Sequence, residues 1–358
     1  MDGAFAELRS RPRDRTPEVE AGRCVHAWLE DAQCRRCVEQ CPRDAWVIDE
    51  ERLGIDTERC DGCGLCVPAC PERAIHPPEL PQVRHWSGRR LVLAACERID
   101  AADPDARVSC LHALDLATLA DWAARGVTHL VTAVPPCADC DRRPNEKLGD
   151  RIARINRLLA DRQLDPLQWR ELPADRWAAM WARTGPAQRD VVLSRRGFLR
   201  RLSGRALQLA LEEAADAAHE DEDAPTRPVA KRLGASCPGT WFLYAPHIDP
   251  ARCTGCNACV RLCPHRALLL DEQTPAYDMD PDACTGCGAC VDVCETDAIR
   301  VERDTHTPQW SLPLTVRRCR ACGAPFHHPR EQPAEDGGAL CPICRKVNHP
   351  AKLYQVYA

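Results

Sequence analysis

The sequence predicts an α+β chain divided into several small modules, and three observations lead to this prediction. A short cysteine phrase occurs four times, in two pairs, within residues 34–71 and 253–294. Between the pairs, apolar runs follow the strand, helix and strand order typical of a small parallel α/β unit. Two Cys-x2-Cys pairs beyond residue 318 make a further cysteine site with a different spacing.

The composition favours metal sites over one large apolar core. Of 358 residues, 25 are cysteine and 30 are proline, while only 5% are aromatic. Most of the cysteines are spaced as metal ligands rather than as disulfide partners, and such reduced thiolates predict a cytoplasmic protein. The formal charge of −5 gives no reason to expect a nucleic-acid partner. No run of 18 apolar residues is present, so no direct membrane span is predicted.

Each cysteine phrase is typical of an iron–sulfur ligand set. Three close cysteines hold one [4Fe–4S] cluster, and the distant fourth binds the neighbouring cluster. The text after that fourth cysteine also repeats, as CPRDAW, CPERAI, CPHRAL and CETDAI. Each half is expected to form a strand, a cysteine loop, a short helix and a return strand. The pairs resemble bacterial 2[4Fe–4S] ferredoxin modules, which places modules at 23–85 and 240–305 and predicts four [4Fe–4S] clusters.

The second module has complete ligand sets. One cluster is expected on Cys253, Cys256, Cys259 and Cys294, and the other on Cys284, Cys287, Cys290 and Cys263. Glu295 stands where the other three phrases have proline after the fourth cysteine. This change alters the turn but removes no ligand.

The first module departs from the pattern at one ligand. Its regular cluster is expected on Cys60, Cys63, Cys66 and Cys41, and the other on Cys24, Cys34, Cys37 and Cys70. Asp31 occupies the position where the missing cysteine is expected, ahead of Cys34. Iron–sulfur clusters prefer soft thiolate ligands, which favours Cys24 as the missing ligand. Cys24 lies ten residues before Cys34 and would reach the cluster across an insertion. The alternatives are an Asp31 oxygen ligand or a labile three-iron centre.

The middle of the chain, residues 88–185, predicts a small parallel α/β domain. Strands are expected at 91–95 and 129–134, and helices at 114–125 and 145–159. Four cysteines lie at strand ends: Cys96, Cys110, Cys137 and Cys140. Buried free cysteine is common, but four in one small unit favour a shared metal centre. Arg151, Arg154 and Arg157 are predicted to form a solvated helix face.

This middle region resembles the delta subunit of methyl-viologen-reducing hydrogenases over about 90 residues. The resemblance rests on Cys96, Cys110, the helix ending at Arg125-Gly126, and Cys137-x2-Cys140 followed by Asn145. It implies a [2Fe–2S] cluster on the four cysteines and electron transfer between a hydrogenase or formate dehydrogenase and a second oxidoreductase. The family's further cysteine just after the first is absent here, near Ile99, and so are the glycine and histidine around the last pair.

The last segment, 312–358, has the spacing of a zinc ribbon. Cys319, Cys322, Cys341 and Cys344 form two knuckles, and four thiolates around zinc give a closed structural site. The same sulfurs around one iron would give a rubredoxin-like redox centre. Zinc is favoured, because structural four-cysteine sites are a common use of this spacing.

Three other segments are assigned from composition and motif. Residues 1–22 predict a flexible tail, and 194–236 predict a basic helix followed by an acidic linker. The stretch SRRGFLRR at 194–201 resembles the opening of the ferredoxin-type accessory protein of periplasmic nitrate reductase. No uncharged apolar region follows it, which argues against an export signal. Cys237 is predicted to be a spare thiol.

These patterns predict a multi-cluster electron-transfer protein or subunit rather than a catalyst by itself. The sequence contains no Walker loop, dinucleotide fingerprint or nucleophile elbow. The expected partners are redox proteins: dehydrogenase, hydrogenase or molybdoenzyme subunits. The alternative is an accessory protein that helps to mature a molybdenum or nickel enzyme. A redox sensor is a weaker alternative, because no effector domain is visible.

Overall fold

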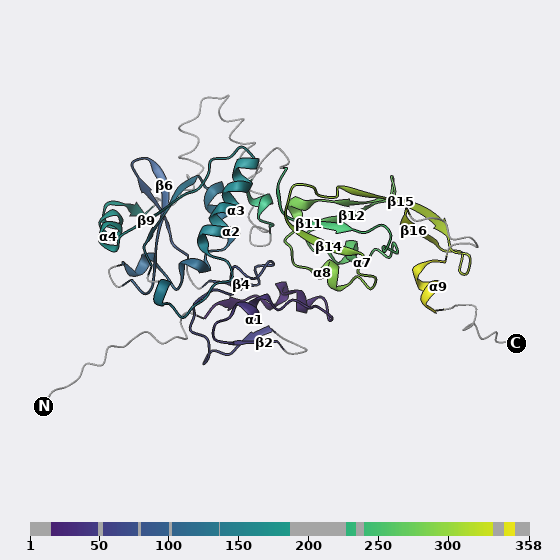
Figure 1. Cartoon of the computed structure of the whole chain (residues 1–358), viewed down its shortest axis with the longest axis horizontal. Coiled ribbons are helices and arrows are strands. Elements are labelled where there is room, and N and C mark those ends of the chain that lie inside the picture. Colours follow the sequence, from purple (N-terminus) through teal and green to yellow (C-terminus); the bar gives the residue numbers. More distant parts are fainter. Residues whose placement is uncertain are drawn as a thin grey trace, which may run out of the picture. The chain divides into compact units, whose positions relative to one another are not determined.

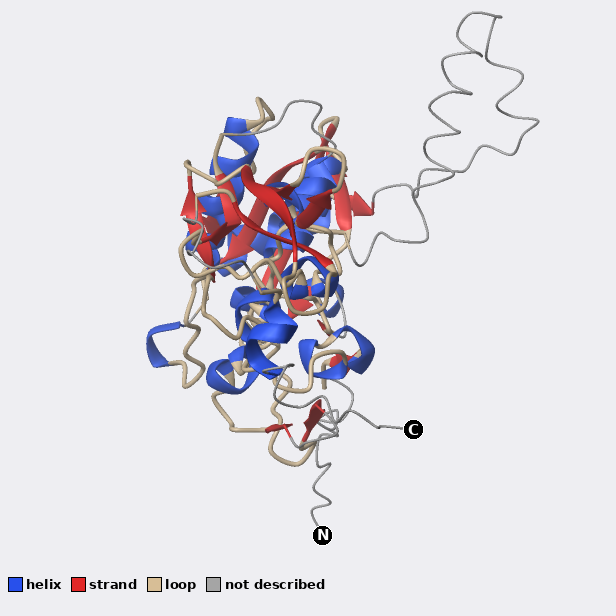
Figure 2. Ribbon diagram, turned by 90° about the vertical axis from the view of Figure 1, so that its right-hand side faces the viewer, coloured by secondary structure: helices blue, strands red, loops and turns tan. Residues whose placement is uncertain are grey.

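The computed structural model describes residues 16–48, 53–77, 80–99, 102–135, 137–186, 227–233, 240–331 and 340–347. The chain divides into two compact units. The first holds the residues up to Cys24 together with Arg35–Cys237, and the second holds Val25–Cys34 together with Pro238–Ala358. Within the described ranges the fold mixes helices with short strands and long loops, as Figure 2 shows.

The first unit begins with a small module of short elements around its cysteines. It contains β1 (Glu18–Val19), α1 (Arg36–Gln40), β2 (Trp46–Ile48), β3 (Leu53–Ile55) and β4 (Ile75–His76). β1 pairs antiparallel with β4, and β2 pairs antiparallel with β3. A core of Trp46, Leu53, Val67 and Ile75 packs with Cys24, Cys37 and Cys66. The cysteines are therefore part of the packing and not only of the surface loops.

A mixed sheet forms the rest of the first unit (Figure 1). Its strands run in the order β10 (Gly185–Pro186), β5 (Val83–Trp86), β6 (Arg89–Cys96), β8 (Val127–Ala133) and β9 (Gln168–Leu172), and β7 (Arg107–Val108) also pairs with β6. β6, β8 and β9 are parallel, whereas β5 and β10 are antiparallel to their neighbours. The run from Leu91 to Cys96 is buried along its whole length, as expected for a strand covered on both faces.

Helices α2 (Leu116–Ala124), α3 (Leu148–Asp161) and α4 (Ala174–Arg183) accompany this sheet. Asp115 caps α2 by accepting a hydrogen bond from the Thr118 N–H at 2.8 Å, and Gly126, at φ +74°, follows its end. Trp177 of α4 is buried against β8 and donates its indole N–H to the Val131 carbonyl at 3.1 Å. The carboxyl ends of β6 and β8 lead directly into the loops that carry the four cysteines of this region.

The second unit contains a repeated strand, loop and helix arrangement. Its elements are β11 (Phe242–Ile248), α7 (Ala258–Leu262), β12 (Leu268–Asp271), β13 (Ala276–Met279), α8 (Ala289–Asp292) and β14 (Ile299–Thr305). β11 pairs antiparallel with β14, and β12 pairs antiparallel with β13. Ile248, Leu268, Tyr277 and Ile299 form a core against which the cysteine loops pack.

The sheet of this module continues into the C-terminal cysteine site. β15 (Ser311–Arg318) pairs with β13, and β16 (Pro325–Pro329) pairs with β15, which gives the order β12, β13, β15, β16. Helix α9 (Pro342–Val347) follows Cys341 and carries Cys344. The expected boundary at residue 312 therefore falls inside a continuous sheet.

Two expectations from the sequence need correction. The flexible tail predicted over 1–22 does not extend to Glu18 and Val19, because these residues form a strand that pairs with His76 and Ile75. The predicted solvated arginine face is wrong for Arg151, which is only 3% exposed because its guanidinium bonds buried carbonyls.

Some sequence features fall outside the described residues. The predicted basic helix and most of the linker at 194–236 lie there, as does Cys237. Among the residues that are described, no helix has the length and apolar character needed to cross a bilayer.

Candidate iron–sulfur and metal centres

The four repeated phrases share one turn at their fourth cysteine. Each of these sulfurs accepts a hydrogen bond from the backbone N–H of the alanine four residues later, at 3.2–3.3 Å: Ala45 to Cys41, Ala74 to Cys70, Ala267 to Cys263, and Ala298 to Cys294. The residue before each alanine has a positive φ of 46–55°. This left-handed residue aims the next N–H at the sulfur, and such hydrogen bonds favour a thiolate and tune a bound cluster. The turn persists at Cys294 although Glu295 replaces proline.

In the second module, the structure brings one predicted ligand set together. Cys253, Cys256, Cys259 and Cys294 line a single cavity of about 450 Å³. Burial raises the pKa of Cys253 to about 11 and that of Cys259 to about 12. A buried thiolate therefore needs a cation beside it, which an iron–sulfur cluster supplies.

The other predicted set of this module gathers around Cys290. Burial raises the pKa of this thiol, and the neighbouring sulfurs of Cys284, Cys287 and Cys263 raise it further. Cys259, from the first set, also lies close enough to act on it. The two sets are thus neighbours within one module, as a path for electrons requires.

The regular set of the first module is likewise assembled. Burial raises the pKa of Cys66, and the sulfurs of Cys63, Cys60 and Cys41 add to the effect. Burial raises the pKa of Cys63 to about 12. These four thiols lie close together, with Cys63 and Cys66 buried and Cys41 and Cys60 partly exposed, which suits a cluster site.

The irregular ligand set of the first module is divided between the two units: Cys24, Cys37 and Cys70 belong to the first unit and Cys34 to the second. Cys24 is 9% exposed and lies in the same core as Cys37, with Cys70 packed against it. Asp31 is exposed to solvent. Cys34 falls in the segment grouped with the second unit, where its carbonyl bonds His26 Nε2 at 2.7 Å.

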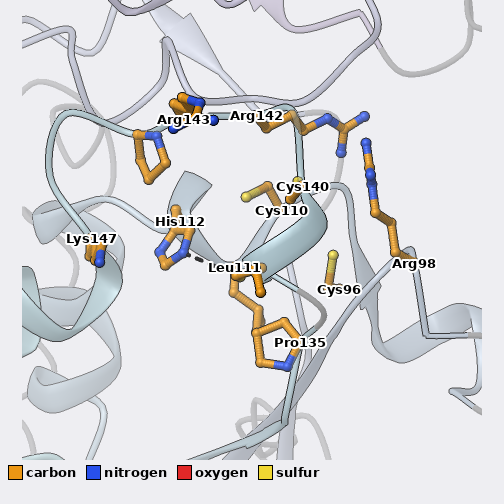
Figure 3. Close-up of a pocket in the computed structure, with 13 residues that line it drawn as sticks. Cys96, Arg98, Cys110, Leu111, His112, Pro135, Cys140, Arg142, Arg143 and Lys147 are labelled. Atoms are coloured by element: carbon orange, nitrogen blue, oxygen red, sulfur yellow. Dashed lines mark hydrogen bonds between the residues drawn. The ribbon is translucent and has the colours of Figure 1, made fainter.

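The four cysteines of the middle region line one cavity of about 320 Å³. Figure 3 shows Cys96, Cys110 and Cys140 around it, with His112, Arg98 and Arg142 nearby. Cys96 ends β6, Cys110 follows β7, and Cys137 and Cys140 follow β8, so the parallel strand ends bring them together. Burial raises the pKa of Cys110 to about 11 and also raises that of Cys96. Four soft donors around one cavity fit an iron–sulfur cluster.

His112 is a member of this cavity that the sequence did not single out. Its Nδ1 accepts a hydrogen bond from the Leu148 N–H at 3.0 Å, so the neutral ring carries its proton on Nε2. Nε2 lies 3.8 Å from Cys137 Sγ, which makes it a donor to that sulfur. Burial lowers the pKa of His112, and Arg151 and Lys147 lower it further, which favours this neutral form.

Arg142 joins the middle cavity to the first ferredoxin-like module. Its Nη1 donates to Glu97 at 2.6 Å and to the Ser109 carbonyl at 2.7 Å, while its Nε donates to Asp61 at 3.1 Å. Burial acts to raise the pKa of Asp61, but the charge of Arg142 and the Cys63 N–H hold it below its ordinary value. Alongside this pair, Cys63, Leu65, Cys110 and Ala113 pack together. A ligand of one predicted cluster therefore packs in the same small core as a cysteine of the middle cavity.

Arg151 is hydrogen-bonded to the backbone of the segment that lines the same cavity. One guanidinium nitrogen donates to the carbonyls of His112 and Leu114, at 2.9 and 2.8 Å. Its Nη2 and Nε bond the Glu146 carbonyl and carboxylate. The buried arginine thus holds the loop that carries Cys110 and His112.

The C-terminal cysteines form a compact site. The sulfurs of Cys319, Cys322, Cys341 and Cys344 all lie within 4.8 Å of one another. The Cys341 N–H donates to Cys319 Sγ at 3.3 Å, and the Cys344 N–H donates to Cys341 Sγ at 3.4 Å. Backbone hydrogen bonds from Cys341 and Cys322 lower the pKa of Cys319 to about 6. Four clustered thiolates with N–H support can hold a tetrahedral metal ion such as zinc.

Comparison with known proteins identifies parts of the chain. Residues 252–298 match the 4Fe–4S dicluster domain family, and residues 53–76 match the 4Fe–4S binding domain family. A ferredoxin of Rickettsia felis is 43% identical over 53 residues, which are 15% of this chain and 48% of the relative. Ferredoxin-1 of Caulobacter vibrioides is 46% identical over 41 residues, 12% of this chain and 36% of the relative.

A further relative belongs to a larger assembly. It is a subunit of an ion-translocating oxidoreductase complex of Methanosarcina acetivorans, and it is 43% identical over 42 residues, 12% of this chain and 16% of the relative. In all three cases the chain spans less than half the length of the relative. The two segments that match the family models contain repeated cysteine phrases. The chain therefore carries two ferredoxin-type 4Fe–4S domains, which bind at least two clusters and support a function in iron–sulfur electron transfer.

Proposed function

We propose that the chain is a multi-cluster electron-transfer protein or subunit that passes electrons between a dehydrogenase- or hydrogenase-type donor and a reductase. The observation that carries this proposal is the packing of Cys63 with Cys110. It makes the regular cluster site of the first module a neighbour of the middle cysteine cavity. Electron transfer requires such short steps between centres, and a storage or purely structural metal site does not.

The proposed centres are four [4Fe–4S] clusters, one [2Fe–2S] cluster and one zinc ion. Cys24 is proposed to complete the first cluster, supported by its burial beside Cys37 and by the exposure of Asp31. The [2Fe–2S] proposal is supported by the single cavity that Cys96, Cys110, Cys137 and Cys140 line. Zinc is supported by the compact C-terminal site. When bound, the clusters supply one-electron redox chemistry, and the chain's residues set their spacing and potentials.

The relay role is tested by following electrons through the intact chain. The protein is purified without air, its iron, sulfide and zinc are measured, and dithionite reduces it in an EPR titration. We expect signals from more than two cubanes and from a [2Fe–2S] centre, with rapid reoxidation by an electron acceptor. The proposal is wrong if the clusters assemble but exchange electrons with no oxidoreductase, while deletion of the gene leaves a partner enzyme unassembled. That result would instead support the accessory role.

Packing between the two sites predicts spin coupling. In the reduced protein, the EPR signal of the middle centre is expected to be broadened by the cluster on Cys60, Cys63, Cys66 and Cys41. Replacing Cys60 with serine removes that neighbour, so the middle signal should sharpen and relax more slowly. The matched control is Cys287→Ser in the second module. If both variants change the middle signal equally, the proposed neighbour relationship is wrong.

His112 is expected to raise the potential of the middle centre. Its Nε2–H donates to Cys137, and hydrogen bonds to a ligand sulfur favour the more negative, reduced cluster. Replacing His112 with phenylalanine should lower the potential by tens of millivolts, at roughly 40 mV for each kcal/mol of lost preference for the reduced state. His112→Gln, which keeps a donor, should restore part of the difference. EPR-monitored redox titration measures the shift, and an unchanged potential in the phenylalanine variant contradicts the assigned hydrogen bond.

A further inference from the structure

The cluster cavity of the second module is lined by residues from distant parts of the chain. Cys253, Cys256, Cys259 and Cys294 line it. Pro342, Ile343, Arg345 and Lys346 of α9, the helix that carries Cys344, line it as well. A segment of the C-terminal cysteine site thus completes the cavity of a predicted iron–sulfur cluster.

An ion pair positions α9 on this cavity. Lys346 Nζ contacts Glu295 Oε2, and Glu295 directly follows the ligand Cys294. The other three phrases have Pro42, Pro71 and Pro264 at this place, so the pairing partner is present only in the phrase that α9 reaches. Both side chains are more than half exposed, and exposed pairs contribute little to stability. The pair is therefore better suited to fixing where α9 lies than to holding the fold together.

A second contact reaches the same cysteine loop from β16. Gly255 lies between Cys253 and Cys256 at φ +72°, and a Cβ there would stand 2.0 Å from the His327 carbonyl oxygen. His327 Nε2 lies 2.5 Å from Asn257 Oδ1, and the Tyr277 hydroxyl donates to the same oxygen at 2.6 Å. The loop that supplies the two proposed ligands Cys253 and Cys256 is thus contacted by both the backbone and the side chain of His327 in β16.

β16 is held by its pairing with β15, whereas α9 depends on the C-terminal cysteines for its placement. β16 follows the Cys319–Cys322 knuckle, and α9 begins directly after Cys341. The two knuckles meet at the four-sulfur site, which therefore fixes α9 relative to β16. A metal ion that ties four thiolates together supplies folding free energy to a small domain. Loss of that ion should release α9 from the cavity.

We propose that the metal-loaded C-terminal site forms the outer cover of the cluster on Cys253, Cys256, Cys259 and Cys294, and that it retains and shields that cluster selectively. The proposal rests on the electron-transfer function proposed above. The C-terminal site acts on only one of the two clusters of the second module, because β16 and α9 contact the Cys253–Asn257 loop and Glu295. The cluster on Cys284, Cys287, Cys290 and Cys263 does not need this cover.

The test compares two backgrounds of the full chain, purified without air. Cys287→Ser leaves the covered cluster as the cubane of the second module, and Cys256→Ser leaves the uncovered one. Each is combined with Lys346→Glu, and iron release to a ferrous chelator is followed under argon. In the Cys287→Ser background we expect Lys346→Glu to speed iron release several-fold. In the Cys256→Ser background the rate should not change.

A charge swap keeps the result interpretable. Glu295→Lys combined with Lys346→Glu restores the ion pair in reversed order, so it should restore slow iron release. Zinc analysis checks that the charge variants keep their C-terminal metal. Cys344→Ser, which removes a metal ligand, should lose zinc and reproduce the fast release. If Lys346→Glu changes the rate of iron release by the same factor in both backgrounds, with clusters and zinc present, the proposed covering role is wrong. Failure of all chains to assemble clusters would instead count against the proposed function.

Discussion

Replacing Cys24 with serine is expected to destroy one cubane of the purified chain, which leaves its site empty or holding a three-iron centre. Cys24 is buried with Cys37 and packs near Cys70, two members of the same predicted ligand set. A serine oxygen is a poor substitute, because iron–sulfur clusters prefer soft thiolate ligands. Iron and sulfide analysis of protein prepared without air measures the loss. EPR shows whether the site is empty or holds a three-iron centre, and either outcome makes Cys24 the ligand of the lost iron.

Asp31→Ala is the matched comparison. Asp31 stands at the position that the repeat predicts for a cysteine, but its side chain is exposed. We expect this variant to keep its full iron and sulfide content and an unchanged EPR spectrum. If Asp31→Ala loses a cluster and Cys24→Ser does not, an oxygen ligand completes the site and the proposed assignment is wrong.

The cysteine sets were predictable because their chemistry is local in sequence. Spacing within Cys253-x2-Cys256-x2-Cys259 constrains three sulfurs to one loop, and the repeated text after each fourth cysteine encodes one turn. At that turn Ala298 and its counterparts donate a backbone N–H to sulfur, and their side chains are buried, which favours a residue as small as alanine. The sequence displayed the repeat, and the structure supplies its physical reason.

The residues that were missed act through tertiary contacts. His112 approaches Cys137 only because β7 and β8 both pair in parallel with β6, and no spacing rule relates the two residues. The helical pattern places Arg151 on a solvated face, because an arginine on a helix is usually exposed. Its position opposite the carbonyls of His112 and Leu114 depends on how α3 packs, which periodicity alone does not specify. The pairing of Glu18–Val19 with β4 is non-local in the same sense.

Replacing Arg142 with methionine is expected to destabilise the first unit by roughly 3 kcal/mol, the low end of the cost of breaking a buried ion pair. The side chain is 6% exposed and compensates both Asp61 and Glu97. Methionine fills a similar volume but leaves two carboxylates without that charge. The cost stays at the low end because Arg43 Nε still contacts Asp61 at 3.2 Å. Urea unfolding followed by circular dichroism at pH 7 measures the change.

The choice of neutral pH follows from the sign of the Asp61 shift. A lowered pKa in the folded protein contributes stability above the ordinary carboxyl value of 3.8, and this contribution disappears as the pH falls through the lower folded-state pKa. The Arg142→Met difference should therefore be full at pH 7. Arg98→Met is the control, because the Arg98–Asp141 pair is exposed and should change stability much less. Equal effects of the two substitutions would contradict the buried role of Arg142.

Arg142→Met should also weaken the middle centre. Arg142 follows Cys140 by two residues and binds the carbonyl of Ser109, the neighbour of Cys110, so it holds two cysteine loops in one geometry. Without it, the variant should retain its cubanes but lose iron from the Cys96, Cys110, Cys137 and Cys140 site. Arg142→Lys keeps the charge but not the forked set of donors, so it should recover stability better than it recovers this centre. That separation between stability and cluster content distinguishes a residue that shapes the cavity from one that only balances charge.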